Sequence, residues 1–243
     1  MRQFLTFFVL IFLFLTGCNS DEQKDEKVTV SSIFNQTISN LDEVENYMMD
    51  YSLVQEVVVP EVNEPIKVKQ DETTYIESDP FQFITDLNLN SEKITLVYKN
   101  EQLYEKSSNE KISNEPFTRL PDLINEQRHL PVLLELFQTM EDQFELNEKE
   151  NSYVLTMSGK GENFKSFVKN QIETATLNGS ELPISQSDLK INEVNIEIKI
   201  DEESKNVQSI HTSFTSDQNK TSIDQQISRN YYDFNKQAKK ISN

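Results

Sequence analysis

The sequence predicts an α+β fold, in which antiparallel strands and several helices pack around one core. Three observations predict it. Apolar residues recur every three or four positions in some stretches, as on the buried stripe of an amphipathic helix. In other stretches apolar and polar residues alternate, as in strands that bury one face, and short polar turns join several of these strands.

The first half of the chain, after its N-terminal segment, predicts one helix followed by strands. Val30, Ile33 and Phe34 begin a stripe with helical spacing. A row of apolar side chains on odd numbers follows, made of Tyr47, Met49, Tyr51, Leu53, Val57 and Val59. Asp79-Pro80 ends the second of the strands. The expected elements are a helix over residues 28–44 and strands over 47–59, 66–76, 94–99 and 103–105, the last two as a hairpin.

The middle of the chain changes to a helical period between Phe117 and Phe144. Pro121 lies near the start of this stretch and Pro131 in its middle. A proline inside a helix removes a backbone hydrogen bond and clashes with the preceding turn, so two helices separated at Pro131 fit better than one. A strand over 153–157, a turn at 159–161 and a further helix over 164–175 are expected to follow.

The C-terminal part has the cleanest alternation in the chain, from Val194 to Ile200. A polar turn over 201–206 leads to two return strands, expected over 207–214 and 221–231. Because neighbouring residues of a strand point to opposite faces, Tyr231 and Tyr232 should send one ring into the core and one into solvent.

Composition limits the class of protein. The 243 residues include 15 Phe and 8 Tyr, which are enough for a sizeable core and argue against wholesale disorder. The formal net charge of −18 excludes nucleic acid as an expected partner, because phosphates need Lys and Arg opposite them. It also argues against electrostatic adhesion to an anionic membrane. We expect a single domain over residues 28–243, and a monomer.

The N-terminal segment predicts export. Arg2 is followed by a run of apolar residues over 4–15, interrupted only by Thr6, which is too short to span a bilayer as a stable helix. The run ends in Leu15-Thr16-Gly17-Cys18, which resembles the lipobox of bacterial lipoproteins at all four positions. The resemblance implies a signal peptide over 1–17, cleavage between Gly17 and Cys18, and diacylglyceryl transfer to the Cys18 sulfur. An ordinary signal peptide with a chance cysteine, or a signal anchor, is the alternative.

Cys18 is also the only cysteine, so no internal disulfide can form and packing alone must stabilise the exported chain. Residues 19–27 contain no apolar side chain, and with Cys18 they form the expected polar tether over 18–27. The expected location is therefore the outer face of the cell membrane, with the lipid on Cys18 as the anchor.

The order of these elements resembles the LolA/LppX-like lipoproteins, and more closely the uncharacterised lipoproteins of low-GC Gram-positive bacteria in that superfamily. The resemblance rests on the strand pair around Tyr98–Tyr104, the strand at 153–156 and the segment 194–210 with its polar turn. It covers nearly the whole chain after the tether. The chain departs from many such relatives in having no Trp.

The resemblance implies a curved antiparallel half-barrel sheet, with helices packed as a lid on its concave face. The resemblance implies that such a fold accommodates a hydrophobic ligand, such as an acyl chain, in a groove between sheet and helices, and a pocket with an apolar lining suits that ligand. The residues expected to line the groove are Tyr47, Met49, Tyr51, Leu53, Ile94, Leu96, Tyr98, Leu133, Phe137, Ile196 and Ile198.

The same side chains would also make a dry core, since any sheet that packs on helices needs them. Phe81, Phe83 and Ile84 fit either a rim of the groove or an edge strand. The competing hypothesis is therefore an interaction or regulatory module with a filled core. An enzyme ranks third, and neither a cofactor nor a metal is expected.

The sequence contains no motif that predicts catalysis or metal binding. His129 and His211 are the only histidines, and neither has a carboxylate or second histidine at ligand spacing, so both are expected at the surface. Neither G-x-S-x-G nor a phosphate-binding glycine loop occurs. The acidic groups at 148–150 and 201–203 lack the alternating pattern of a calcium loop and are expected to be solvated turns.

Overall fold

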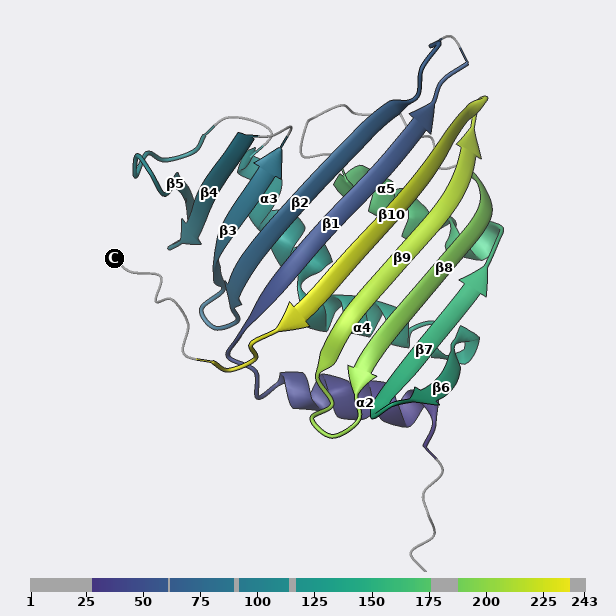
Figure 1. Ribbon diagram of the computed structural model, residues 1–243, viewed down its shortest axis with the longest axis horizontal. Helices are drawn as coiled ribbons and strands as arrows, with labels where there is room; N and C mark the ends of the chain where they lie inside the picture. The colour runs from purple at the N-terminus through teal and green to yellow at the C-terminus, as the bar shows by residue number, and fades with distance from the viewer. Residues whose placement is uncertain (1–27, 61, 90–91, 114–116, 176–187, 237–243) are drawn as a thin grey trace, which may run out of the picture.

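In the computed structural model the chain forms a ten-stranded antiparallel sheet with helices on one face (Figure 1). The structure describes residues 28–60, 62–89, 92–113, 117–175 and 188–236; the predicted signal peptide and tether lie outside them. The strand order is β5-β4-β3-β2-β1-β10-β9-β8-β7-β6. Since β5 and β6 are its two edges and do not pair, the sheet is a curved, open half-barrel, and the predicted α+β class is confirmed.

Two meanders build this sheet and meet at its centre. The first contains β1 (Asn46–Val58), β2 (Ile66–Glu77), β3 (Gln82–Leu89), β4 (Glu92–Lys99) and β5 (Gln102–Glu105). The second contains β6 (Glu145–Lys149), β7 (Ser152–Gly159), β8 (Lys190–Asp201), β9 (Val207–Gln218) and β10 (Thr221–Tyr232). The first and last strands pair with each other, with Leu53 opposite Ile227, so residues far apart in the sequence become neighbours.

The helices come from three places in the chain. They are α2 (Val30–Leu41), α3 (Leu120–Leu123), the π-helical turn η2 (Ile124–Arg128), α4 (Leu130–Gln138) and α5 (Lys165–Ala175), with single 3₁₀ turns η1 (Phe117–Arg119), η3 (Glu141–Gln143) and η4 (Glu162–Phe164). In the view of Figure 1, α3, α4 and α5 cross behind the sheet and α2 lies along its lower end. The covered face is called the inner face below.

The central helical stretch is divided close to the predicted point. His129 has an extended backbone (φ −62°, ψ 126°), and Pro131 lies in the first turn of α4. A proline is tolerated in a first turn, where the backbone N–H groups have no helical partner. The free N–H of Leu130 donates instead to the Tyr47 hydroxyl, at 3.1 Å. A strand residue thus fixes the start of the lid helix.

Two details of the sheet differ from the sequence prediction. The stretch that contains Phe83 and Ile84 forms β3, which lies between β2 and β4 and is not an edge strand, and Phe83 is fully buried. Strand β6, one of the true edges, was not expected. Its five residues, Glu145–Lys149, are mostly polar and exposed, so no alternation of apolar side chains marks it.

The core lies between the inner face and the helices. α2 buries Ile33, Phe34 and Leu41, and its N-terminus is closed by a capping box between Thr29 and Ser32. The Phe34 and Phe144 rings meet edge to face, with their centroids 5.6 Å apart. On β10, Tyr231 is buried and Tyr232 is 37% exposed, which confirms the predicted division of this tyrosine pair.

Candidate functional site

A charged row crosses the middle of the inner face. Tyr51 on β1 lies opposite Glu72 on β2 and, on its other side, opposite Arg229 on β10. All three side chains are buried: Tyr51 and Glu72 are each 3% exposed and Arg229 is 2% exposed. The row continues into apolar residues on both sides. A glutamate and an arginine thus occupy positions that the pattern of each strand assigns to the core.

Arg128, at the end of η2, completes the row from the helical side. Its Nη1 lies 2.5 and 2.7 Å from the two carboxylate oxygens of Glu72. Its guanidinium carbon lies 4.1 Å from the centre of the Tyr51 ring, which is cation–π distance. Burial alone would lower the pKa of Arg128, but the adjacent Glu72 carboxylate outweighs that effect and the pKa is raised. The ion pair thus links η2, on the helical side, to β2 of the sheet.

Arg229 has no such carboxylate among the described residues. Its guanidinium carbon lies 5.5 Å from the Tyr51 ring centre, and its Nη2 donates to Gln171 Oε1 over a long 3.4 Å. Its Nε, which is buried, has no hydrogen-bond partner in this structure. Burial lowers the pKa of Arg229; Tyr231, Tyr51 and Glu72 offset part of this effect, and the nearby Arg128 adds to it.

The charges of this group do not balance. Two guanidiniums and one carboxylate leave an excess of one positive charge among the described side chains of the row. Arginine keeps its charge in proteins, so it cannot relieve the imbalance by losing a proton. An uncompensated buried charge costs on the order of several kcal/mol. Tyr51 and Gln171 offset part of that cost, because both present electron-rich groups to the cations.

Further polar side chains surround the arginines. Gln55 Nε2 donates to Gln225 Oε1 at 2.7 Å, and Gln225 Nε2 donates to the Gln171 backbone carbonyl at 3.3 Å. Several buried polar atoms near them have no partner in the structure, including Arg128 Nη2, Thr212 Oγ1 and Tyr231 Oη. Buried polar groups are nearly always hydrogen-bonded, so a concentration of unpartnered ones is unusual. We call Tyr51, Glu72, Arg128, Gln171 and Arg229 the arginine cluster.

The residues predicted to line a groove all lie between the sheet and the helices. Those that are buried, at 3% exposure or less, are Tyr47, Met49, Tyr51, Leu53, Leu96, Leu133, Phe137, Ile196 and Ile198. Ile94 and Tyr98 are partly buried and pack against the same core. The structure therefore gathers these side chains on one side of the sheet. Their contact with a ligand stays a prediction.

His129 is not at the surface, and that prediction was wrong. Its ring is largely buried and stacks on Tyr47, with centroids 6.2 Å apart, while Phe81 meets it edge-on at 5.8 Å. Its Nε2 is buried without a partner, and burial lowers the pKa of His129 to about 4. His211 is exposed on the outer face, as predicted.

Sequence reasoning found Tyr51 as an apolar lining residue but missed the charges around it. A signal for Arg229 was present, because it follows Ile223, Gln225 and Ile227 on the odd-numbered face of its strand. Arg128 gives no such signal, because its short π-helical turn has no apolar stripe from which its direction could be inferred.

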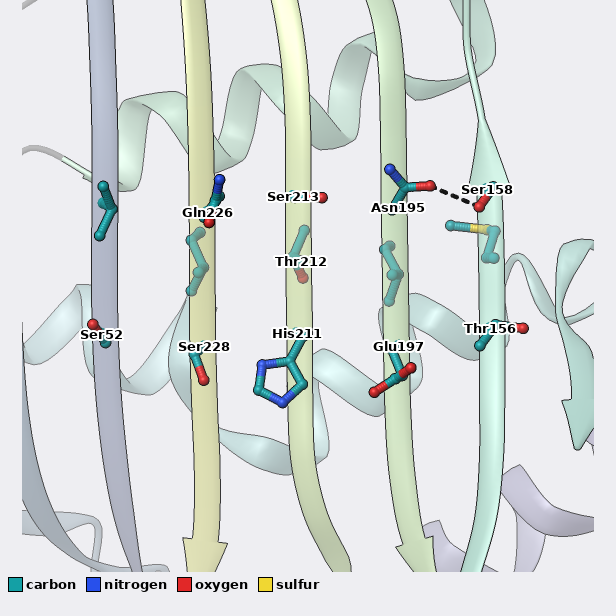
Figure 2. Close-up of a pocket in the computed structure, with 14 residues that line it drawn as sticks. Ser52, Thr156, Ser158, Asn195, Glu197, His211, Thr212, Ser213, Gln226 and Ser228 are labelled. Atoms are coloured by element: carbon teal, nitrogen blue, oxygen red, sulfur yellow. Dashed lines mark hydrogen bonds between the residues drawn. The ribbon is translucent and has the colours of Figure 1, made fainter. Parts of the chain in front are cut away.

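The outer face carries a hollow of about 680 Å³ over the centre of the sheet. Figure 2 shows two rows of polar side chains in it, from five neighbouring strands. One row contains Ser52, Ser228, His211, Glu197 and Thr156, each paired with the next across the strands. In the other, Ser158 Oγ donates to Asn195 Oδ1 at 2.7 Å. The labelled side chains of both rows are polar, and Val54, Met157, Ile196 and Ile227 add apolar surface to the same hollow.

In the part of the chain that the structure describes, no helix is long and apolar enough to cross a membrane. The His, Cys, Asp and Glu side chains of the same part include no group of three or more that could hold a metal ion. The carboxylate of Asp201, in one of the acidic turns, accepts hydrogen bonds from the backbone and hydroxyl of Ser204.

Comparison with known proteins gives a family and several similar folds. A family model described as a family of unknown function (DUF6612) matches residues 29–242. No curated protein matches the chain in sequence. Among solved structures the chain is similar to LprF from Mycobacterium bovis, with a TM-score of 0.46 and 10% identity over 88% of this chain and 96% of that one.

Two further structures are similar to this chain. Lipoprotein LppX from Mycobacterium tuberculosis has a TM-score of 0.43 and 10% identity, over 86% of this chain and 96% of that one. An outer membrane lipoprotein-sorting protein domain from Vibrio parahaemolyticus has a TM-score of 0.25 and 8% identity, over 86% and 94%. At such identities the ligand of this chain has to be argued from its own side chains.

Proposed function

The chain belongs to DUF6612, a family of unknown function, and we propose that it is a lipid-anchored lipoprotein that binds a hydrophobic ligand, such as a lipid, between sheet and helices. One observation carries the binding proposal. Buried polar groups without partners, above all Arg229, lie beside the buried apolar side chains that fill the space between sheet and helices. A mostly apolar lining with a few convergent polar groups is the usual character of a small-molecule site.

The rest of the proposal concerns location. Lipidation of Cys18 would hold the domain outside the cell membrane, and the polar residues 19–27 would separate the domain from the bilayer. Closeness to the uncharacterised lipoproteins of low-GC Gram-positive bacteria, the monomeric state and the lack of enzymatic activity remain predictions as well. The protein would act by holding its ligand, without altering it.

A second candidate function is an envelope interaction module with a filled core. The observation that favours it is the burial of the predicted lining residues, since Met49, Leu53 and Ile198 are all fully buried by their neighbours. In that case a partner would contact the outer face or the helices, and the unpartnered polar groups of the inner face would be structural.

Native mass spectrometry with organic extraction separates the two functions. The fragment 19–243, which contains every described element, would be purified from its own host. A lipid bound at one per protein would support the carrier function and give its chemical class. A protein that carries no lipid and binds no acyl probe in solution would contradict it and favour the interaction module.

A further inference from the structure

We propose that the arginine cluster binds the anionic head, a carboxylate or phosphate, of a single-chain lipid whose acyl chain lies along the apolar part of the inner face. The inference rests on the proposed function, because it names the ligand of the same site. Arg229 and Arg128 would contact the head, with Glu72 holding Arg128 in place.

The first argument is the distribution of arginine in the chain. There are four, Arg2, Arg119, Arg128 and Arg229, among 23 basic residues, so the chain mostly uses lysine. Two of these four meet at one buried tyrosine ring, in a protein whose net charge is −18. Arginine suits a buried anion better than lysine, because its planar fork donates two parallel hydrogen bonds to a carboxylate or phosphate.

The second argument is the state of the donors. Glu72 is bound to Nη1 of Arg128, and the buried Nη2 of the same guanidinium is left without a partner. Arg229 Nε is unpartnered too, and so is the buried hydroxyl of Tyr231, two residues further along the same face of β10. A bound anion would supply both the missing acceptor and the missing negative charge. A neutral head would supply at most the acceptor.

The third argument is the surroundings of the cluster along its row. From Arg229 the paired positions run to Ile210 on β9, Ile198 on β8 and Leu155 on β7. All three side chains are fully buried and apolar. The charged head and the apolar chain of one lipid therefore match two adjoining parts of a single row, and a ligand with only one of these properties would leave the other part unmatched.

Calorimetric titration of the 19–243 fragment, freed of any bound lipid, with three chain-matched probes tests this inference. The probes are dodecanoate and dodecyl phosphate, each below its micelle concentration, and dodecanol below its solubility limit. We expect at least one anionic probe to bind about tenfold or more tightly than dodecanol, as a charge-assisted pair of hydrogen bonds would give. The tighter of the two anions then identifies the head as carboxylate or phosphate.

Variants assign the preference to the arginine. Arg229→Met keeps a side chain of similar length without charge, and it should lower the affinity for the anionic probe about tenfold while the affinity for dodecanol stays the same. Arg119→Met is the matched control, because Arg119 is exposed, and it should keep the preference of the parent. Thermal melts establish that both variants fold.

The outcomes are distinct. Equal binding of all three probes by the parent would overturn the anionic head and leave the proposed function standing. Binding of none of them would overturn both. A preference that survives in Arg229→Met would overturn the role of Arg229. The comparison of probes on the parent requires no variant, so it decides the inference even where a variant fails to fold.

Discussion

Arg128 and Glu72 form an ion pair that is buried on both sides: 2% of the arginine side chain and none of the glutamate side chain is exposed. Arg128→Met would leave the Glu72 carboxylate buried without its cation. We expect a loss of about 3–5 kcal/mol in the free energy of unfolding, measured by urea denaturation, because a buried charge without a partner is strongly unfavourable.

The matched control is Lys67, whose ion pair with Glu56 has side chains that are 71% and 40% exposed. Lys67→Met should change the free energy of unfolding by no more than about 1 kcal/mol, because water and side-chain entropy weaken exposed pairs. The double variant Arg128→Met, Glu72→Met should recover most of the loss. Equal effects of the Arg128 and Lys67 substitutions would contradict this reading of the pair.

In protein freed of any lipid, Arg229→Met should raise the free energy of unfolding, whereas Arg128→Met should lower it. The Arg229 substitution removes a buried charge that has no carboxylate partner among the described residues, so we expect a gain of about 1–3 kcal/mol in the free energy of unfolding. The measurement is again urea denaturation, with Arg119→Met as control at about ±0.5 kcal/mol. A clear loss of stability would mean that Arg229 is compensated in the free protein.

His129 should make stability depend on pH. Its pKa is about 4 in the folded protein, below the ordinary value of about 6.5 that it regains on unfolding. As the pH falls through this window, the unfolded state binds a proton that the folded state does not. The free energy of unfolding should therefore fall by up to about 3 kcal/mol between pH 6.5 and pH 4.

His129→Phe removes the titrating group but keeps a ring against Tyr47. Denaturation at a series of pH values should show that this variant lacks the decline, relative to the parent, between pH 6.5 and pH 4. His211→Asn is the control, since His211 is exposed on the outer face, and it should follow the parent. A His129→Phe curve parallel to that of the parent would show that His129 is protonated equally in both states.

Two leucines on α4 test how the helix faces the sheet. Leu134 is fully buried and Leu136 is 37% exposed. Leu134→Ala should lower the free energy of unfolding by about 2–5 kcal/mol, since it leaves a cavity in the core, whereas Leu136→Ala should change it by less than about 1 kcal/mol. Similar losses in both variants, measured by denaturation, would contradict the orientation of this helix.

Cys18 decides the proposed location. Cys18→Ser removes the thiol that lipidation requires, so the variant should incorporate no label when cells are grown with an alkyne fatty acid. The parent should be labelled and should stay with the membrane fraction. If the variant is labelled, or if the parent is not, the segment ending in Cys18 is not a lipoprotein signal.

Much of the fold could be predicted because its strands have one buried face. The odd-numbered apolar residues of β1 and the alternation in β8 predict both the strand and which of its faces is buried. Pro131 predicts a break in the helices. Strand β6 was not predicted because neither of its faces is strongly apolar. Residue patterns of this kind are local, so they can be recognised without knowing what lies opposite.

The sequence by itself determined the α+β class and most of the elements, and it predicts the lipidation of Cys18 and no nucleic-acid partner. Only the tertiary structure decided that Arg128, Glu72 and Arg229 meet at Tyr51, and that His129 is buried. The reason is physical. A charged side chain gives the same signal in the sequence whether it lies in water or in the core, and pairing between strands and helices distant in the sequence determines which.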